Sequence, residues 1–212
     1  MSYHKARKDY TKHMLVEADC PSSPFKLLDE WLLDAHSESE DANAFTLSTV
    51  NENGQPSSRI VLLRSLTELG VVFYTNYDSQ KGNEMSQNPM VSINFFWPWI
   101  ERQVRIGGNV TKVPSEISDA YFKSRPRKSQ IGAITSAQSK ELKVRETLEN
   151  RVIELTSEFE GRDIPRPENW GGYIVTPSYF EFWQGRASRL HDRIRYDVLA
   201  EDHNWSISRL YP

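Results

Sequence analysis

Residues 44–66 read AFTLSTVNENGQPSSRIVLLRSL, and this stretch decides the fold class. Its first part, Ala44–Val50, alternates polar and apolar residues in the manner of a half-buried strand. Asn53-Gly54 then gives a strong β-hairpin signal, because both residues tolerate a positive φ. The run that follows, Ser57–Leu66, is rich in β-branched and large apolar residues. Two such runs joined by a tight turn predict antiparallel pairing.

Further strands and helices extend this pattern in both directions. Strand-like runs are predicted over 71–76, 90–97, 102–113, 172–176, 179–183, 191–198 and 205–209. Helical spacing predicts helices over 24–36, 78–87, 114–124, 127–134 and 141–159, and the first of them is expected to cover one face of a sheet. Successive strands with tight turns favour an antiparallel barrel or sandwich with flanking helices. We therefore expect one mainly β domain over 21–212, preceded by a polar, mobile N-terminal arm over 1–20.

The composition is typical of a soluble protein and excludes several classes. The 212 residues are 38% hydrophobic and 26% charged, with a formal net charge of −3, so neither a general nucleic-acid surface nor a membrane span is expected. Cys20 is the single cysteine, which rules out an internal disulfide. The first residues lack the apolar core of a secretion signal, so a cytoplasmic protein is expected. We expect no bound metal.

A second informative stretch, residues 179–196, reads YFEFWQGRASRLHDRIRY. An aromatic run up to Trp183 is followed by a turn at Gly185 and then by a basic segment. Alternation would place four side chains on one side of an extended chain, namely Arg189, His191, Arg193 and Arg195. Such a face suits a planar anion, because arginine binds oxyanions with its fork and stacks on flat rings. The alternative is an exposed basic strand edge that guards against edge pairing.

Two blocks earlier in the chain carry cations beside predicted strands. Arg59 and Arg64 flank an apolar strand, where each is either part of an anion site or an end residue that reaches solvent. Lys81 follows a strand end at the start of a helix. Free backbone N–H groups and an ammonium at such a place make a phosphate cradle, although an ordinary helix start with a solvated lysine is the commoner case.

Two further blocks carry polar groups suited to a ligand. Gln103 opens a strand, and its amide either meets the edge of a planar ring or lies at the surface. Tyr121, Arg125 and Ser129 recur at four-residue spacing, so they would share a helix face unless Pro126 breaks the helix. A phenol, a guanidinium and a hydroxyl together would bind a phosphate monoester, whereas the alternative is a basic helix end.

The order of residue types in these blocks is a more specific signal of function than their charge. FWQGxxxRLHDR at 182–193 and YFxSRPxxSQIG at 121–132 resemble motifs of the pyridoxine/pyridoxamine 5'-phosphate oxidase family, which are FMN enzymes that make pyridoxal 5'-phosphate. RIVLLR from 59, FYTN from 73, RQV from 102 and the pair at 138–139 resemble further family blocks in the family's order. The resemblance runs from about residue 43 to the C-terminus. It implies an antiparallel split β-barrel with flanking helices, which forms a homodimer with FMN at the subunit interface.

The resemblance also implies roles for individual residues. The residues on FMN would be Arg59, Ile60, Val61, Leu62, Leu63, Arg64, Tyr74, Thr75, Gln80, Lys81, Gln103, Gln138, Ser139, Trp183 and Arg193. The residues on the substrate would be Arg7, Tyr10, Arg64, Tyr121, Arg125, Ser129, Arg189, Leu190 and His191. Arg189 and His191 would form the catalytic pair that places the pyridine ring against the flavin, and the Leu190 side chain between them would point into packing. Arg64 and Gln80 stand where the family has lysine and arginine.

The implied activity is oxidation of pyridoxine or pyridoxamine 5'-phosphate at the 4'-carbon. Dioxygen would be the electron acceptor and hydrogen peroxide a product, and the amine substrate would also release ammonia. Two alternatives stay open, namely a related split-barrel FMN oxidoreductase with another substrate and a non-catalytic carrier of pyridoxal 5'-phosphate. The first alternative would keep the FMN blocks but has no reason to keep the phosphate cluster at 121–129.

Overall fold

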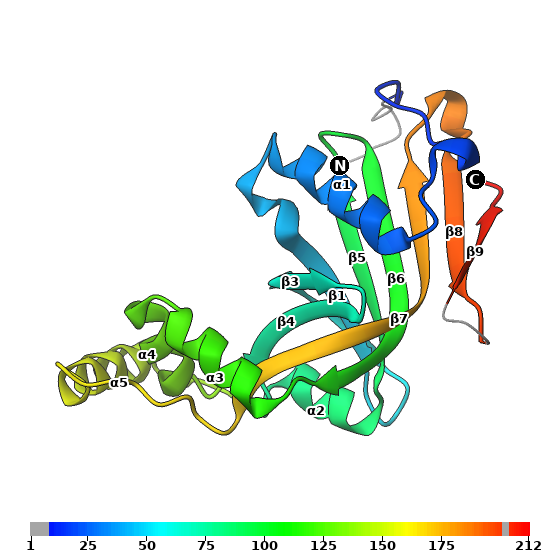
Figure 1. The fold of residues 1–212 in the computed structure, drawn as a ribbon. Coiled ribbons are helices and arrows are strands. Elements are labelled where there is room, and N and C mark those ends of the chain that lie inside the picture. Colours follow the sequence, from blue (N-terminus) through cyan, green and yellow to red (C-terminus); the bar gives the residue numbers. More distant parts are fainter. Residues whose placement is uncertain (1–8, 201–203) are drawn as a thin grey trace.

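The framework of the protein is one curled antiparallel sheet (Figure 1), seen in a computed structural model that describes residues 9–200 and 204–212. Its strands are β1 (Ala44–Val50), β2 (Pro56–Leu62), β3 (Ser65–Thr67), β4 (Gly70–Asn76), β5 (Met90–Trp97), β6 (Arg102–Lys112), β7 (Trp170–Gln184), β8 (Asp192–Val198) and β9 (Trp205–Arg209). They pair in the order β2-β1-β5-β6-β7-β4-β3, while β8 pairs with β7 and β9. The predicted antiparallel framework is therefore confirmed.

The sheet closes into a split barrel because its two end strands are neighbours in the chain. β2 and β3 lie at opposite ends of the hydrogen-bonding order, yet only Leu63 and Arg64 separate them. The Leu63 N–H donates to the Asn43 carbonyl (2.8 Å), and the Arg64 N–H donates to the Val72 carbonyl (2.9 Å), so the chain turns a corner here from β1 to β4. The single strand predicted over 57–66 was therefore wrong, because a barrel corner divides it.

β7 is one strand of 15 residues where the sequence predicted two. Its first half pairs with β4, its second half pairs with β8, and β6 runs beside it from Tyr173 to Gln184. Pro177 does not end the strand, because the register of β6 shifts at this point between Gly107 and Gly108. A Cβ on Gly108 would lie 2.2 Å from the Thr176 carbonyl oxygen, so glycine permits the close approach of the two strands.

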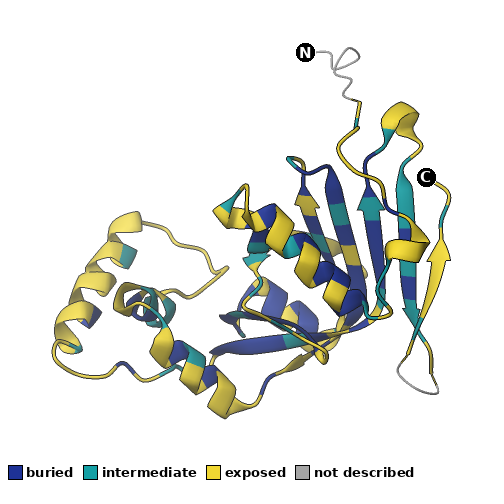
Figure 2. Ribbon diagram, turned by 45° about the horizontal axis from the view of Figure 1, so that its top comes forward, coloured by how far each residue is buried: buried dark blue, intermediate teal, exposed yellow. Residues whose placement is uncertain are grey.

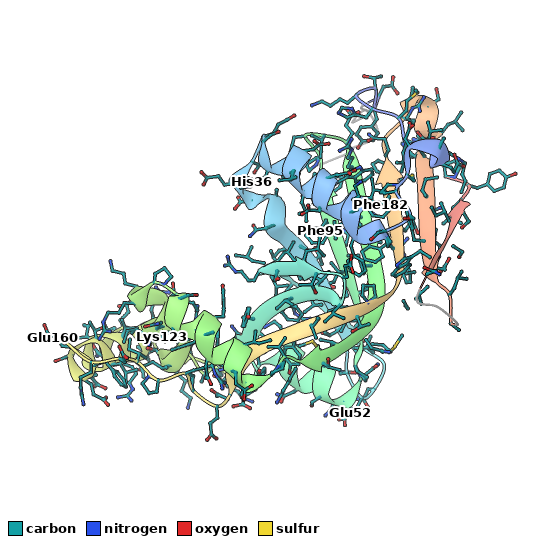
Figure 3. All side chains as sticks on the ribbon, in the orientation of Figure 1. His36, Glu52, Phe95, Lys123, Glu160 and Phe182 are labelled. Atoms are coloured by element: carbon teal, nitrogen blue, oxygen red, sulfur yellow. The ribbon has the colours of Figure 1, made fainter. Side chains whose placement is uncertain are left out.

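Helices flank the sheet on two sides. The α-helices of the described residues are α1 (Pro24–His36), α2 (Gln80–Gln87), α3 (Ser115–Ser124), α4 (Arg127–Thr135) and α5 (Arg145–Glu158). α1 covers the sheet as predicted, and its Trp31 packs edge-on against the buried Phe182 with ring centroids 5.2 Å apart. Phe182 is labelled beside α1 in Figure 3. α3, α4 and α5 lie on the other side of the molecule from β8 and β9 (Figure 1). No helix in the described part of the chain is both long and apolar enough to cross a membrane.

α5 is shorter and more exposed than the helix predicted over 141–159. It begins at Arg145, and Leu155 is its buried residue. Most of the helix has the colour of exposed residues in Figure 2. Val144 precedes the helix in an extended conformation and makes no side-chain cap. Without a capping residue, the apolar spacing could not locate the start of the helix.

The basic segment after Gly185 departs furthest from its prediction. Residues 187–189 form a 3-10 turn in which Ser188 and Arg189 have φ angles of 57° and 63°. β8 begins only at Asp192, so strand alternation does not extend back to Arg189. The common face predicted for positions 189 to 195 was therefore wrong at its first residue. Leu190 is 69% exposed and is not packed as expected.

Residues 9–20 are the described part of the predicted N-terminal arm. Leu15 is buried in the main core, and Glu17–Asp19 form a short 3-10 turn. The Tyr196 hydroxyl donates to the Pro21 carbonyl at 2.9 Å, which ties the end of this segment to β8. The segment therefore lies against the barrel along most of its described length.

Candidate functional site

A cavity of about 300 Å³ lies where β2, β4, α2 and α3 meet. It is lined by Arg59, Ile60, Val61, Leu62, Arg64, Tyr74, Thr75, Lys81, Tyr121, Arg125, Gln138 and Trp170. Every lining residue except Trp170 was predicted to contact the cofactor or the substrate. The lining carries four cationic side chains and no carboxylate, so its electrostatic potential favours anions.

Lys81 lies in the first turn of α2 and is only 8% exposed. Its ammonium donates to Gln138 Oε1 at 2.9 Å and to Thr75 Oγ1 at 3.3 Å, and no carboxylate of the described residues pairs with it. Burial and the like charge of Arg59 lower the pKa of Lys81 to about 8, against the opposing effect of Glu84. A buried ammonium held by neutral oxygens is the kind of group that an anion would stabilise.

Arg125 follows α3 and places its guanidinium carbon 4.5 Å from the centre of the Trp170 ring. Its Nη1 is buried and has no hydrogen-bond partner within residues 9–200 and 204–212. Burial lowers the pKa of Arg125, and the like charge of Arg64 adds to this effect. An unpaired buried donor costs about 1–3 kcal/mol, and a charged one costs more, so this nitrogen is suited to an acceptor atom on a ligand.

Ser129 and Arg125 both line a second, adjoining cavity of about 280 Å³. The full lining of this cavity is Asn76, Arg125, Ser129, Gly132, Ala133, Ser136, Gln138 and Trp170. Pro126 does break the helix, because α3 ends at Ser124 and α4 begins at Arg127. Tyr121 of α3 and Ser129 of α4 therefore approach Arg125 from two helices. Tyr121 does so from the first cavity and Ser129 from the second.

Glu84 of α2 is a residue of this site that the sequence analysis missed. Its carboxylate accepts hydrogen bonds from Ser57 Oγ (2.7 Å), Gln80 Nε2 (2.9 Å) and the Thr49 hydroxyl, and it pairs with Arg59 at 3.3 Å. Burial raises the pKa of Glu84, but these hydrogen bonds and the Arg59 charge outweigh it and lower the pKa to about 2. Glu84 therefore stays ionised and fixes Arg59 at the cavity wall.

Six predicted cofactor residues do not line either cavity. Gln103, Trp183 and Arg193 lie on other strands and are described below, and the other three are Leu63, Gln80 and Ser139. Leu63 lies at the barrel corner and packs on the main core. The Gln80 amide donates to Glu84, so it does not take the place of the positive charge that the family's arginine would carry at this position. Ser139 is in an exposed turn with a φ of 70°. Their roles in binding stay predictions.

A second group of predicted residues lies on β6, β7 and β8. Gln103, Trp183 and Arg193 are direct cross-strand neighbours, and they form a row across the three strands. Arg193 donates to Glu181 Oε1 through Nε (3.0 Å) and to the Tyr211 carbonyl through Nη1 (2.8 Å). Glu181, which is buried, therefore fixes the arginine of this row in the way that Glu84 fixes Arg59.

The turn before β8 brings the predicted catalytic pair close to this row. The ring of His191 lies 4.6 Å from that of Trp183, and its Nδ1 accepts a hydrogen bond from the Arg186 N–H at 3.1 Å. Burial and the nearby Arg189 lower the pKa of His191, against the opposing effect of Asp192. Tyr10 packs edge-on against both Trp183 and His191. Arg7 lies outside the described residues.

The two groups occupy different parts of one chain. None of the residues of the second group, Gln103, Trp183, Arg189, His191 and Arg193, lines either cavity of the first. β7 connects them, because Trp170 at its start lies under Arg125 and Trp183 near its end lies in the row. Within a single subunit the predicted residues therefore form two partial sites rather than one.

Comparison with known protein families accounts for the presence of two partial sites in one chain. Residues 32–157 match the family model described as pyridoxamine 5'-phosphate oxidase, which covers more than half of the chain. The chain belongs to the pyridoxamine 5'-phosphate oxidase family. Residues 170–212 also match the pyridoxine 5'-phosphate oxidase C-terminal dimerisation region, and of the second group Trp183, Arg189, His191 and Arg193 lie in this part of the chain.

Full-length relatives support membership of the pyridoxamine 5'-phosphate oxidase family. The pyridoxine/pyridoxamine 5'-phosphate oxidase of Leptospira biflexa is 50% identical over 207 residues, which is 97% of each chain. That of Christiangramia forsetii is 48% identical over 208 residues, covering 97% of this chain and 96% of the relative.

Solved structures show the same fold. PhzG from Burkholderia lata 383, solved in complex with tetrahydrophenazine-1-carboxylic acid, superposes with a TM-score of 0.87 at 31% identity, covering 94% of this chain and 98% of PhzG. An FMN-binding protein from Nostoc punctiforme superposes with a TM-score of 0.72 at 18% identity, covering 91% of this chain and all of the other. The split barrel inferred from the sequence is therefore confirmed.

Proposed function

We propose that this protein is an FMN-dependent oxidase that converts pyridoxine or pyridoxamine 5'-phosphate to pyridoxal 5'-phosphate. Relatives of about 50% identity over nearly the whole chain carry the name of that activity. The observation that carries the proposal within this structure is the cationic cavity, where Lys81 has no carboxylate partner and Arg125 has a buried unpaired donor among the described residues. Both features suit ligands that bear phosphate groups.

The cavity residues fit a cofactor phosphate and a substrate phosphate at neighbouring places. Lys81, Thr75 and Gln138 form one polar cluster, and this cluster would hold the phosphate of FMN. Arg125, with Tyr121 and Ser129 beside it, would hold the substrate phosphate. Arg64 lines the first cavity and adds charge on the side of Arg125.

The chain's own residues bind and orient the reactants. Bound FMN would supply the redox chemistry, in which two electrons and a proton leave the substrate's 4'-carbon, a second proton leaves its hydroxyl or amino group, and two electrons and two protons are finally passed to dioxygen. Pyridoxine 5'-phosphate and O₂ thus give pyridoxal 5'-phosphate and H₂O₂, while pyridoxamine 5'-phosphate also consumes water and releases NH₃. Arg189 and His191 would hold the pyridine ring in place. The Nδ1 of His191 accepts from a backbone N–H, so the neutral ring presents Nε2–H as a donor.

The proposal includes a homodimer with FMN at the subunit interface. Three observations support it. The two partial sites do not meet within one chain, residues 170–212 match a dimerisation region, and β2 exposes Ile60 and Leu62 beside the cavity. Exposed apolar side chains next to an incomplete site are typical of a surface that another subunit covers. The row of Trp183 and Arg193 would then face the partner's cavity.

Anaerobic reduction distinguishes the oxidase from the alternatives. We expect the purified protein to be yellow and its flavin absorbance to bleach when pyridoxamine 5'-phosphate is added without oxygen, and to recover with H₂O₂ on admission of air. A carrier would show only the absorbance of the bound aldehyde. A flavoprotein of another specificity, in line with the ligand in the PhzG structure, would keep its colour but would not bleach with either pyridoxine or pyridoxamine 5'-phosphate.

The lowered pKa of Lys81 predicts a pH dependence of FMN binding. Below about pH 8 the ammonium is charged and the FMN affinity is greatest, because the cation binds the phosphate. Above that pH the lysine must take up a proton on binding, so the Kd for FMN should rise by up to about tenfold per pH unit. Fluorescence titration between about pH 7 and 9 measures this slope.

Two controls isolate Lys81 in that titration. Riboflavin lacks the phosphate, so its Kd should not follow the titration of the lysine. Lys81→Met should bind FMN weakly and with little dependence on pH over the same range. A Lys81→Met protein with the slope of the wild type would show that another group causes the pH dependence.

A further inference from the structure

A segment that we call the strap, residues 10–16, crosses the end of the row on β6, β7 and β8. The backbone N–H groups of Thr11 and Lys12 both donate to Glu101 Oε2, at 2.8 and 3.0 Å. The Lys12 ammonium donates to the Trp99 carbonyl. Glu101 is 3% exposed and lies about ninety positions along the chain from the strap, so these bonds fix where the strap crosses the barrel.

A second carboxylate holds the other end of the strap. The Leu15 N–H donates to Asp192 Oδ2 at 3.1 Å, and the Leu15 side chain is buried in the main core. Arg209 donates to both Asp192 Oδ1 (2.8 Å) and the Leu15 carbonyl (2.9 Å). The strap is therefore held at residues 11–12 and again at residue 15.

These two attachments place Tyr10 over the predicted substrate-facing histidine. Its ring centroid lies 5.7 Å from Trp183 and 5.8 Å from His191, with edge-on geometry to both. A Cβ on Gly185 would lie 2.7 Å from Tyr10 Cβ, so a larger residue at 185 would displace the tyrosine. Glycine at 185 therefore makes room for the covered arrangement.

Glu101 has a backbone conformation that glycine would adopt more readily. Its φ is 58°, in the turn between β5 and β6. Its carbonyl accepts from the Gly185 N–H (2.8 Å) and from Gln184 Nε2 (3.1 Å), which ties this turn to the end of β7. A left-handed conformation is unfavourable for a residue with a side chain, so the turn alone gives no reason for glutamate here. The strap contacts do give one, because a carboxylate accepts two N–H groups at once.

We propose that Glu101 is a positioning residue whose carboxylate holds the strap and so keeps Tyr10 over His191 and Trp183. The two hydrogen bonds from the Thr11 and Lys12 N–H groups to Glu101 are called the clasp. The inference rests on the proposed function, since it takes His191 and Trp183 to face the substrate and the flavin. The clasp would favour retention of the substrate by pre-organisation, because a strap that is held in place need not be ordered when the substrate binds.

Glu101→Gly tests the clasp without straining the turn, because glycine favours the φ of 58°. In the holoenzyme we expect trypsin to cleave after Lys12 about tenfold faster or more, because the strap now opens. The KM for pyridoxamine 5'-phosphate should rise about tenfold, with kcat and FMN content changed by less than about threefold. Glu101→Gln should lie between the glycine variant and the wild type, because its amide oxygen still accepts. Glu17→Gln, which removes an ion pair to Arg209 but neither bond to Glu101, should match the wild type.

The outcomes separate this inference from the proposed function. Wild-type cleavage and KM in Glu101→Gly would overturn the clasp, and faster cleavage with unchanged KM would overturn its role in holding substrate. A lowered melting temperature of Glu101→Gly with a normal KM would show that Glu101 stabilises the turn and does not position Tyr10. If the wild type oxidised no B6 phosphate while cleavage still depended on Glu101, the clasp would stand and the proposed function would fail.

Discussion

Arg125→Ala should lower kcat/KM for pyridoxamine 5'-phosphate by about 10²- to 10⁴-fold, if two charge-assisted hydrogen bonds of about 1.5–3 kcal/mol each are lost. The guanidinium lies over Trp170 with a buried unpaired Nη1, so its interactions are completed only by a ligand. The thermal stability of the ligand-free protein should not fall, because the change removes a desolvated charge that lacks a partner. Steady-state kinetics and the melting temperature measure the two effects.

Matched variants test whether the position or only the charge of Arg125 matters. Arg127→Ala removes a cation two residues away that donates to the Phe159 and Arg162 carbonyls and lines neither cavity, so kcat/KM should be unchanged. Arg125→Lys keeps the charge but loses the planar fork and the stacking, so its loss should be intermediate. Equal kcat/KM for Arg125→Ala and the wild type would contradict the assignment of the substrate phosphate to this cavity.

Arg189→Ala should lower kcat/KM by on the order of 10²-fold, or about 2.7 kcal/mol of transition-state stabilisation. The residue lies in a turn with a φ of 63°, beside His191, and its side chain makes no hydrogen bond or ion pair with the described residues. Its charge and planar face are therefore available to a ligand. His191→Ala should cause a smaller loss if the imidazole only orients the substrate. FMN content and steady-state kinetics should be measured for each variant.

Two further variants separate the substrate and cofactor roles of this region. Arg189→Asn also removes the charge but tolerates a positive φ, so a similar loss would exclude backbone strain as the cause. Arg193→Ala should act in the opposite way and reduce FMN retention first, because Arg193 extends from the row with Trp183. Loss of flavin from Arg189→Ala, with normal turnover once FMN is added, would refute this division.

The sequence predicted most elements because their residues obey local rules. The hairpin at Asn53-Gly54 and the proline-started α1 are examples in which the deciding signal lies within a few residues. The corner at Leu63 and Arg64 contains no glycine, proline, asparagine or aspartate to mark a turn, and only closure of the barrel divides the predicted strand. Pro177 would normally end a strand, but a register shift on the opposite strand accommodates it.

The cavity was predictable where charge and family letters coincide, as at Arg59, Lys81 and Arg125. The sequence did not reveal which carboxylates hold Arg59, Arg193 and the strap. Glu84 and Glu181 meet Arg59 and Arg193 only after strands and helices pack, and Glu101 meets Thr11 across ninety positions of chain. Alternation within the aromatic run does place Glu181 on the face of Trp183, which was the one available signal.

Because β7 is unbroken, the number of residues in this strand determines the spacing of the two partial sites. At about 3.3 Å per residue, the strand measures about 45 Å along its contour from Trp170 to Gln184. Deleting one residue from its middle would turn Glu181 and Trp183 inward and Phe182 outward, because side chains alternate between faces. Natural insertions and deletions should therefore fall outside β7, in stretches such as 160–169, and a circular permutation opened there should be better tolerated than one opened within the strand.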